Sequence, residues 1–169
     1  MKLLATLLSA MAASATVVVA SPKSSESARE VALRLKVDST GNGFLQLGVD
    51  GVLRAYSAGG GAILDAAPLS PLQIEELAAR GRAIPKINAV MPDYTGVDGR
   101  NVPEAELLNP PPEVAAAVVA RGLADLTSAA SPLTRRQDCG NIICTGDGVC
   151  TSNGCVFCIF FVPGIGACV

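Results

Sequence analysis

The sequence predicts a small disulfide-rich β peptide at the C-terminal end of a secreted precursor, preceded by a pro-region that holds a β-meander and a helix. The first observation behind this prediction is that all six cysteines lie in the last 31 of the 169 residues, from Cys139 onward. The second is that all 13 Lys and Arg residues lie at or before Arg136, and the residues that follow carry only Asp138 and Asp147 as charges. Such a boundary in composition indicates two parts with separate roles.

Composition also argues against several classes of function. The chain contains no His, so it lacks the commonest general base and the imidazole metal ligand. It has no glycine-rich phosphate-binding motif, and its cysteine-rich segment has no basic patch. We therefore expect a protein that is not an enzyme, takes no cofactor and does not bind nucleic acid.

Residues 1–20 have the three parts of a secretory signal peptide. Lys2 precedes an apolar stretch, and small residues lead up to Ala20, after which we expect cleavage, with Ala15 as the second choice. A membrane anchor is the competing interpretation, but the apolar stretch is short for a spanning helix and is interrupted by Ser and Thr. We therefore expect a secreted, extracellular product whose cysteines are oxidised.

Three strands are expected next. Apolar residues alternate with Arg and Lys across residues 31–37, which is the period of a half-buried strand. Residues 44–49 and 52–57 flank Asp50-Gly51, a pair typical of a two-residue type I′ hairpin turn. The sequence thus predicts a three-stranded β-meander.

A helix is expected over residues 71–80. Ser70 is a good N-cap residue, a proline occupies the first helical position, and Gln73 completes a capping box. Gly81 supplies a stop signal. Together with the strands, this helix predicts a small β/α unit over residues 31–81.

Residues 84–136 are interpreted as a linker, because they begin with a stretch rich in Pro, Gly, Asp and Asn that has few regular signals. An Ala- and Val-rich stretch over residues 113–127 predicts one weak helix within it. The region before the cysteines therefore suits assistance to folding or secretion, with a spacer that has no fold of its own as the alternative.

Arg135-Arg136 is the only dibasic pair in the chain, and it lies just before the first cysteine. A secretory protease of the kexin or furin type needs two cations in an extended segment, and Pro132 disfavours a helix just before the pair. We therefore expect a processing protease to cut after Arg136. The products would be a pro-region, residues 21–136, and a mature peptide, residues 137–169.

An even number of cysteines in a short secreted segment indicates three disulfides, for which the sequence alone allows fifteen pairings. So short a peptide cannot offset its loss of conformational entropy by burying apolar surface, so the cross-links are structural. A zinc site or a redox site at Cys155 and Cys158 is the competing interpretation. There is no second pair of this spacing, no His and no βαβ context, so we expect no metal. The cysteines are Cys139, Cys144, Cys150, Cys155, Cys158 and Cys168.

Their spacing is C-x4-C-x5-C-x4-C-x2-C-x9-C, which resembles that of the cystine-knot miniproteins called knottins. Within that class it is most similar to the plant metallocarboxypeptidase inhibitors, with which the five-residue and two-residue intervals agree. The resemblance implies a cystine-knot-like fold with a short antiparallel hairpin, and a C-terminal residue, here Val169, that enters the groove of a protease. The precursor layout is also similar to that of small secreted cysteine-rich proteins of fungi. The cysteine pairs that the knottin resemblance implies are Cys139 with Cys155, Cys144 with Cys158, and Cys150 with Cys168.

A long apolar stretch lies between the fourth and the last cysteine. Pro163-Gly164 suits the centre of a type II turn, so residues 159–162 and 165–168 are expected to form the terminal hairpin. Because disulfides occupy the interior of a small knot, we expect these apolar side chains to be exposed and to bind a partner. The alternative is that they form the core of the peptide. The candidate target-binding residues are Ile159, Phe160, Phe161, Val162, Ile165 and Val169.

Three functions fit these features. The first is a module that binds and modulates an extracellular protein, with inhibition of a protease such as a metallocarboxypeptidase as its sharpest form. The second is a membrane-active toxin or effector peptide, although the segment lacks the cations that attract peptides to anionic membranes. The third is a structural surface protein that assembles through its apolar loop.

Overall fold

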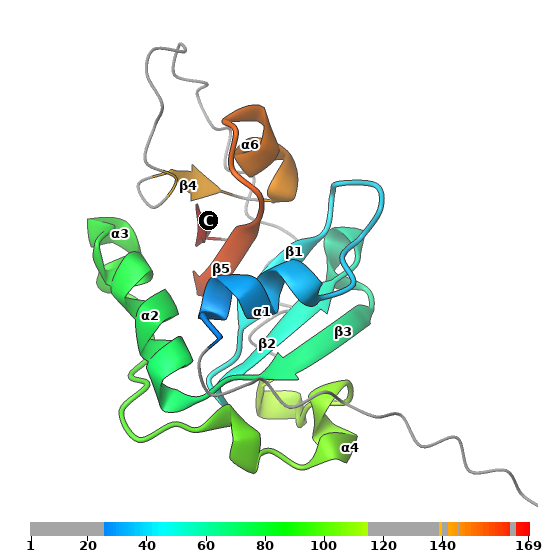
Figure 1. Ribbon diagram of the computed structural model, residues 1–169, viewed down its shortest axis with the longest axis vertical. Helices are drawn as coiled ribbons and strands as arrows, with labels where there is room; N and C mark the ends of the chain where they lie inside the picture. Colours follow the sequence, from blue (N-terminus) through cyan, green and yellow to red (C-terminus); the bar gives the residue numbers. More distant parts are fainter. Residues whose placement is uncertain (1–25, 115–138, 140–141, 145, 163–164) are drawn as a thin grey trace, which may run out of the picture.

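A single mixed β-sheet of six strands contains strands from both the N-terminal region and the cysteine-rich segment (Figure 1). The computed structural model describes residues 26–114, 139, 142–144, 146–162 and 165–169. The strand order is β3-β2-β1-β5-β6-β4. The strands are β1 (Phe44–Leu47), β2 (Val52–Tyr56), β3 (Ile63–Pro68), β4 (Ile143–Cys144), β5 (Cys158–Val162) and β6 (Ile165–Cys168). The helices are α1 (Ala28–Arg34), α2 (Pro71–Arg82), α3 (Pro85–Asn88), α4 (Glu104–Leu107) and α6 (Asp147–Ser152), with 3-10 turns η1 (Ala58–Gly60) and η2 (Gly99–Asn101).

β1 and β2 form the expected hairpin, but its turn has three residues rather than two. The N–H of Gly48 donates to the carbonyl of Val52 (2.9 Å), and the N–H of Gly51 donates back to the carbonyl of Gly48 (3.0 Å). Gly51 has a φ of +78°, a left-handed conformation that glycine adopts without steric cost. A three-residue loop that ends in a left-handed glycine is the next commonest hairpin connection after the two-residue turn.

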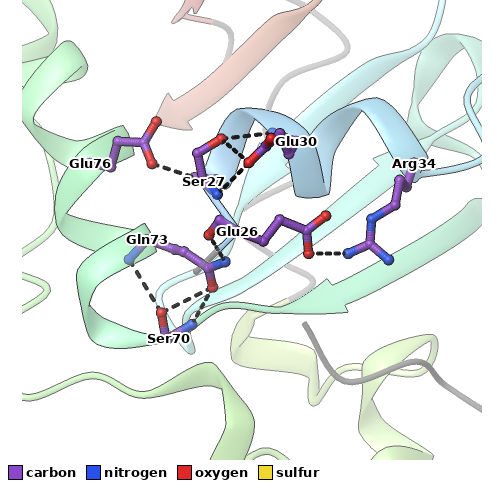
Figure 2. Close-up of polar contacts among 8 residues, drawn as sticks. Glu26, Ser27, Glu30, Arg34, Ser70, Gln73 and Glu76 are labelled. Carbon is purple, nitrogen blue, oxygen red and sulfur yellow. Dashed lines mark hydrogen bonds and ion pairs between the residues drawn. The ribbon is translucent and has the colours of Figure 1, made fainter. Parts of the chain in front are cut away.

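The prediction of a strand over residues 31–37 is wrong, because most of this stretch lies in α1 (Figure 2). The hydroxyl of Ser27 accepts the N–H of Glu30 (3.2 Å), and the carboxylate of Glu30 accepts the N–H of Ser27 (2.8 Å). This capping box starts a helix, and helical spacing then leaves Leu33 46% exposed. The third strand of the meander is instead β3. The buried residues of α1 and its C-terminal cap are Ala28, Val31, Ala32 and Leu35.

α2 begins at the expected capping box and runs two residues beyond the expected end. Figure 2 shows that the caps of α1 and α2 lie together. The side-chain amide of Gln73 donates to the carbonyl of Glu26 (2.7 Å), and the carboxylate of Glu76 accepts the N–H of Ala28 (2.8 Å). These bonds fix the N-terminal ends of the two helices to each other.

Residues 84–114 pack against the fold rather than forming the expected linker. Ile87, Tyr94 and Leu107 are buried. The buried guanidinium of Arg54 on β2 donates to the carbonyls of Leu107 (2.9 Å) and Glu106 (3.2 Å), which anchors α4. Most of the weak helix expected over residues 113–127 lies outside the described residues.

The two largest hydrophobic clusters of the described residues lie on opposite faces of the sheet. α1 and α2 cover the first face (Figure 1). Their apolar residues share one cluster with side chains of β1, β5 and β6. The second cluster contains Phe160 and the cysteines, with Phe44 packed against it. No helix in the described part of the chain has the length and apolar character that crossing a membrane requires.

We predict that Arg54→Met lowers the free energy of unfolding by about 3 kcal/mol, because the partly buried carboxylate of Asp50 loses its counter-ion and the carbonyls of Leu107 and Glu106 lose their donor. Asp50 accepts two hydrogen bonds from Arg54 (2.7 and 3.0 Å), and Met fills similar space without replacing them. Urea unfolding of the oxidised full chain measures the change. Arg29→Met, at an exposed position on α1, is the control; an equal effect of the two substitutions would contradict the prediction.

Candidate functional site

The structure pairs all six cysteines as disulfides and leaves none free. The pairs are those that the knottin resemblance implies, with Cα–Cα distances of 5.8, 5.8 and 5.3 Å in chain order. The sulfurs of Cys144, Cys150 and Cys168 lie within 4.8 Å of one another, but disulfide sulfurs are not the thiolates that bind zinc. The cysteines therefore cross-link the segment. Cys139 is joined to Cys155, Cys144 to Cys158, and Cys150 to Cys168.

The expected terminal hairpin is confirmed, with β5 and β6 antiparallel and β4 paired to the far side of β6. Its turn, Pro163-Gly164, lies outside the described residues. Val169 continues the pairing beyond β6, because its N–H donates to the carbonyl of Phe157 (3.0 Å) and its carbonyl accepts the N–H of Val156 (2.8 Å). Val169 is thus held by backbone hydrogen bonds in this form of the chain.

β5 sends alternate side chains to the two faces of the sheet. Ile159 and Phe161 belong to the cluster beneath α1 and α2. Phe160 belongs to the disulfide cluster, and its ring contacts that of Phe44 edge to face at 4.8 Å. Phe44 in turn stacks on Tyr56 at 5.1 Å. The period of two along a strand therefore gives the two phenylalanines different environments.

The apolar stretch is buried in the full chain, and the exposure that we expect of the freed peptide stays a prediction. Ile159 and Phe161 are 0% and 2% exposed, and Phe160 and Val169 are also buried. Ile165 is half-buried, and Val162 ends β5. The physical reason is that β1 of the N-terminal region pairs in parallel with β5, with Leu45 opposite Ile159.

We call the apolar surface that the cysteine-rich segment buries against the N-terminal region the docking face. Gly81 shows how closely α2 approaches it. A Cβ atom at this position would lie 3.2 Å from the Phe161 ring and 2.8 Å from the sulfur of Met91. Gly81 is therefore not the stop signal that the sequence suggested, because it lies inside α2, where a side chain would collide with Met91 and crowd the ring of Phe161. The residues of the docking face are Phe157, Ile159, Phe161, Ala167 and Val169.

Comparison with protein-family models, with curated proteins and with solved structures finds no match. The expected processing residues, Arg135 and Arg136, lie outside the described residues, and cleavage there remains a prediction.

Asp147 is a buried residue of the cysteine-rich segment that the sequence interpretation did not single out as a site residue. It lies at the start of α6, is 5% exposed, and accepts the N–H of Cys158 on Oδ1 (2.7 Å). Burial raises the pKa of its carboxyl to about 6; the bond from Cys158 opposes the rise and the charge of Asp38 adds to it. The available sequence signal was that Asp147 is one of only two charges after Arg136.

Asp147 also lies where the two parts meet. Its N–H donates to the carbonyl of Gly43 (3.4 Å), in the loop that precedes β1. The charge of Asp38, which comes from the same loop, opposes ionisation of Asp147. Asp38 itself is half-buried, and hydrogen bonds from Thr40 and Ala58 hold its pKa below the usual range. At neutral pH the junction therefore brings a buried carboxylate near a second carboxylate.

We predict that Asp147→Asn stabilises the oxidised full chain at pH 7 but not at pH 3.5. The folded pKa of Asp147, about 6, lies above the ordinary value of 3.8. The carboxyl is thus mainly neutral in both states at pH 3.5, and the stability that its protonated form contributes is lost as the pH rises from about 3.8 through about 6. The amide oxygen of Asn still accepts the Cys158 N–H. The gain expected above pH ~6 is roughly 2 to 3 kcal/mol, from the size of the pKa difference. Urea unfolding across this pH range measures it; a difference that does not change with pH would contradict the assignment.

Proposed function

We propose that residues 137–169, once freed, form a secreted disulfide-rich peptide that binds an extracellular protein through the docking face and does not act as an enzyme. The observation that carries this proposal is that the apolar side chains of the docking face share one cluster with helices and strands that precede the dibasic pair. Removal of those elements would expose the face. An exposed, contiguous apolar patch on a soluble peptide marks a site of interaction.

The disulfides support secretion and a rigid binding surface. Disulfides persist in oxidising compartments, which fits an extracellular product. Their pairing order, first with fourth, second with fifth and third with sixth, supports a cystine-knot-like arrangement of the knottin kind. Cross-links of this density hold the docking face in place before a partner arrives, which lowers the entropy cost of binding.

An exposed strand edge supports recognition of a partner by strand addition. Without the N-terminal region, β5 would be paired only on its β6 side, and a segment of the target could occupy the place of β1. Ile159 and Phe161 would then bury against the target. A protease is the most specific target that we propose, because extended segments bind protease grooves by strand addition.

A membrane-active peptide is the second candidate. The exposed apolar face would favour it, but the segment after Arg136 contains no Lys or Arg. Cationic residues normally draw amphipathic peptides to anionic bilayers. The charge of the peptide therefore favours a protein target.

We predict that the oxidised peptide inhibits carboxypeptidase A and that Phe161→Asp weakens inhibition about tenfold to hundredfold, since burying a Phe stabilises a complex by roughly 1.5 to 3 kcal/mol. Ser152→Asp, at an exposed position on α6, is the matched control. Inhibition constants and leakage from phosphatidylcholine vesicles, with and without phosphatidylserine, are measured side by side. Vesicle leakage without inhibition would favour the membrane-active candidate. Inhibition that survives Phe161→Asp but disappears when Val169 is deleted would move the site to the C-terminal residue.

We also predict that replacing both Arg135 and Arg136 with Ala leaves the pro-region attached to the secreted protein, because a dibasic-specific protease requires both cations. Arg135→Lys, which keeps two cations, should be processed like the unmodified chain. Intact mass spectrometry of the secreted protein distinguishes the two products. Secretion of the unmodified protein with its pro-region still attached would contradict the processing proposal.

A further inference from the structure

No disulfide joins the cysteine-rich segment to the N-terminal region. All three cross-links lie between Cys139 and Cys168. A cut anywhere between residues 114 and 139 would therefore leave two chains with no covalent bond between them. Whether they separate depends on the contacts across the junction.

The backbone contacts across the junction are complementary. Leu45 and Gln46 on β1 pair with Ile159 and Phe160 on β5 in parallel register. β1 lies between β2 and β5, and β5 lies between β1 and β6. Separation would leave each part with an open sheet edge, which is a surface that readily pairs again.

The side-chain contacts are specific in shape. Phe161 occupies the space above Gly81, where the helix has no side chain of its own. Phe160 adds an edge-to-face contact with Phe44 on the other face of the sheet. Each part thus supplies the surface that the apolar groups of the other require.

The junction also contains two unfavourable groups. Oε1 of Gln46 is buried and accepts no hydrogen bond among the described residues. The buried carboxyl of Asp147 lies close enough to Asp38 for their charges to interact. A buried polar atom without a partner and a buried charge both weaken the association of the surfaces that enclose them. These groups oppose the apolar contacts and favour an association that can be reversed.

We propose that residues 26–114 are a binding domain for the six-cysteine peptide, and that this domain retains the peptide non-covalently after the chain is cut between them. While it is bound, β1 and α2 occupy the docking face. The peptide is therefore latent until the domain dissociates, a consequence that rests on the proposed function, whereas the retention itself does not.

The test uses the oxidised full chain with Arg135 and Arg136 replaced by the recognition sequence of a site-specific protease, so that it does not depend on natural processing. After the cut, size-exclusion chromatography at neutral pH and micromolar concentration should show the two chains eluting together. Denaturing mass spectrometry confirms that the cut is complete. Analytical ultracentrifugation over a dilution series then gives the dissociation constant.

Substitutions at the junction should change this constant in both directions. Phe161→Ala and Gly81→Leu should each raise it by about tenfold or more, and Gln46→Leu should lower it. Leu72→Ala, on α2 but 82% exposed, is the matched control and should leave it unchanged. Phe161→Ala alters only the peptide, so the test stands even where Gly81→Leu impairs folding of the domain.

Two results would overturn the proposal. One is immediate elution of the peptide by itself after the cut. The other is a dissociation constant that is the same for the cleaved chain without a junction substitution and for its Phe161→Ala and Gln46→Leu variants. Retention of a peptide that inhibits no carboxypeptidase when isolated would leave the binding domain standing and would count against the protease form of the proposed function.

Discussion

The parallel pairing of β1 with β5 is the interaction on which the rest of the structure depends. It joins two groups of three strands that lie far apart in the sequence into one sheet. It also places Ile159 and Phe161 beneath α1 and α2, where they complete the larger hydrophobic cluster. Bringing such distant segments together has a large entropy cost, and the apolar area buried along both faces of the pairing opposes that cost.

The cysteine-rich segment is stabilised in a different way on each face of the sheet, and this difference bears on which face can bind a target. On one face of the sheet, the disulfides and Phe160 form a covalently cross-linked core within the segment, and Phe44 of the N-terminal region packs against it as a partly buried neighbour. On the other face, Ile159 and Phe161 pack against helices of the N-terminal region. The first face would persist when the chain is cut, whereas the second would become available to another molecule once the N-terminal region dissociates. This division is why we assign target binding to the docking face.

Polar groups at the junction set a limit on how tightly the two parts associate. Sequences that fold well tend to satisfy every buried polar group, and exceptions concentrate where function requires them. Gln46 is such an exception, and Asp147 adds a buried carboxyl whose ionisation is unfavourable; both lie where the N-terminal region meets the cysteine-rich segment. A junction built only for stability would carry apolar residues at these positions. The observed residues suit a domain that covers the peptide and later releases it.

The sequence by itself determined the features that depend on neighbours within one turn of chain: the capping box of α2, the hairpin at Gly51 and the terminal hairpin. It also determined the cysteine-rich class, and the knottin resemblance implied the pairing that the structure has. The capping box of Ser27 and Glu30 was a local signal for α1, although the apolar alternation over residues 31–37 favoured a strand. A short apolar pattern fits both the helical period of about 3.6 residues and the strand period of about 2. Only the tertiary structure decided that Arg54 anchors residues 106–107 and that Gly81 receives Phe161. Contacts between distant segments leave no signal in the local sequence. The burial of the docking face was decided by strand pairing across the whole chain, which no window of sequence contains.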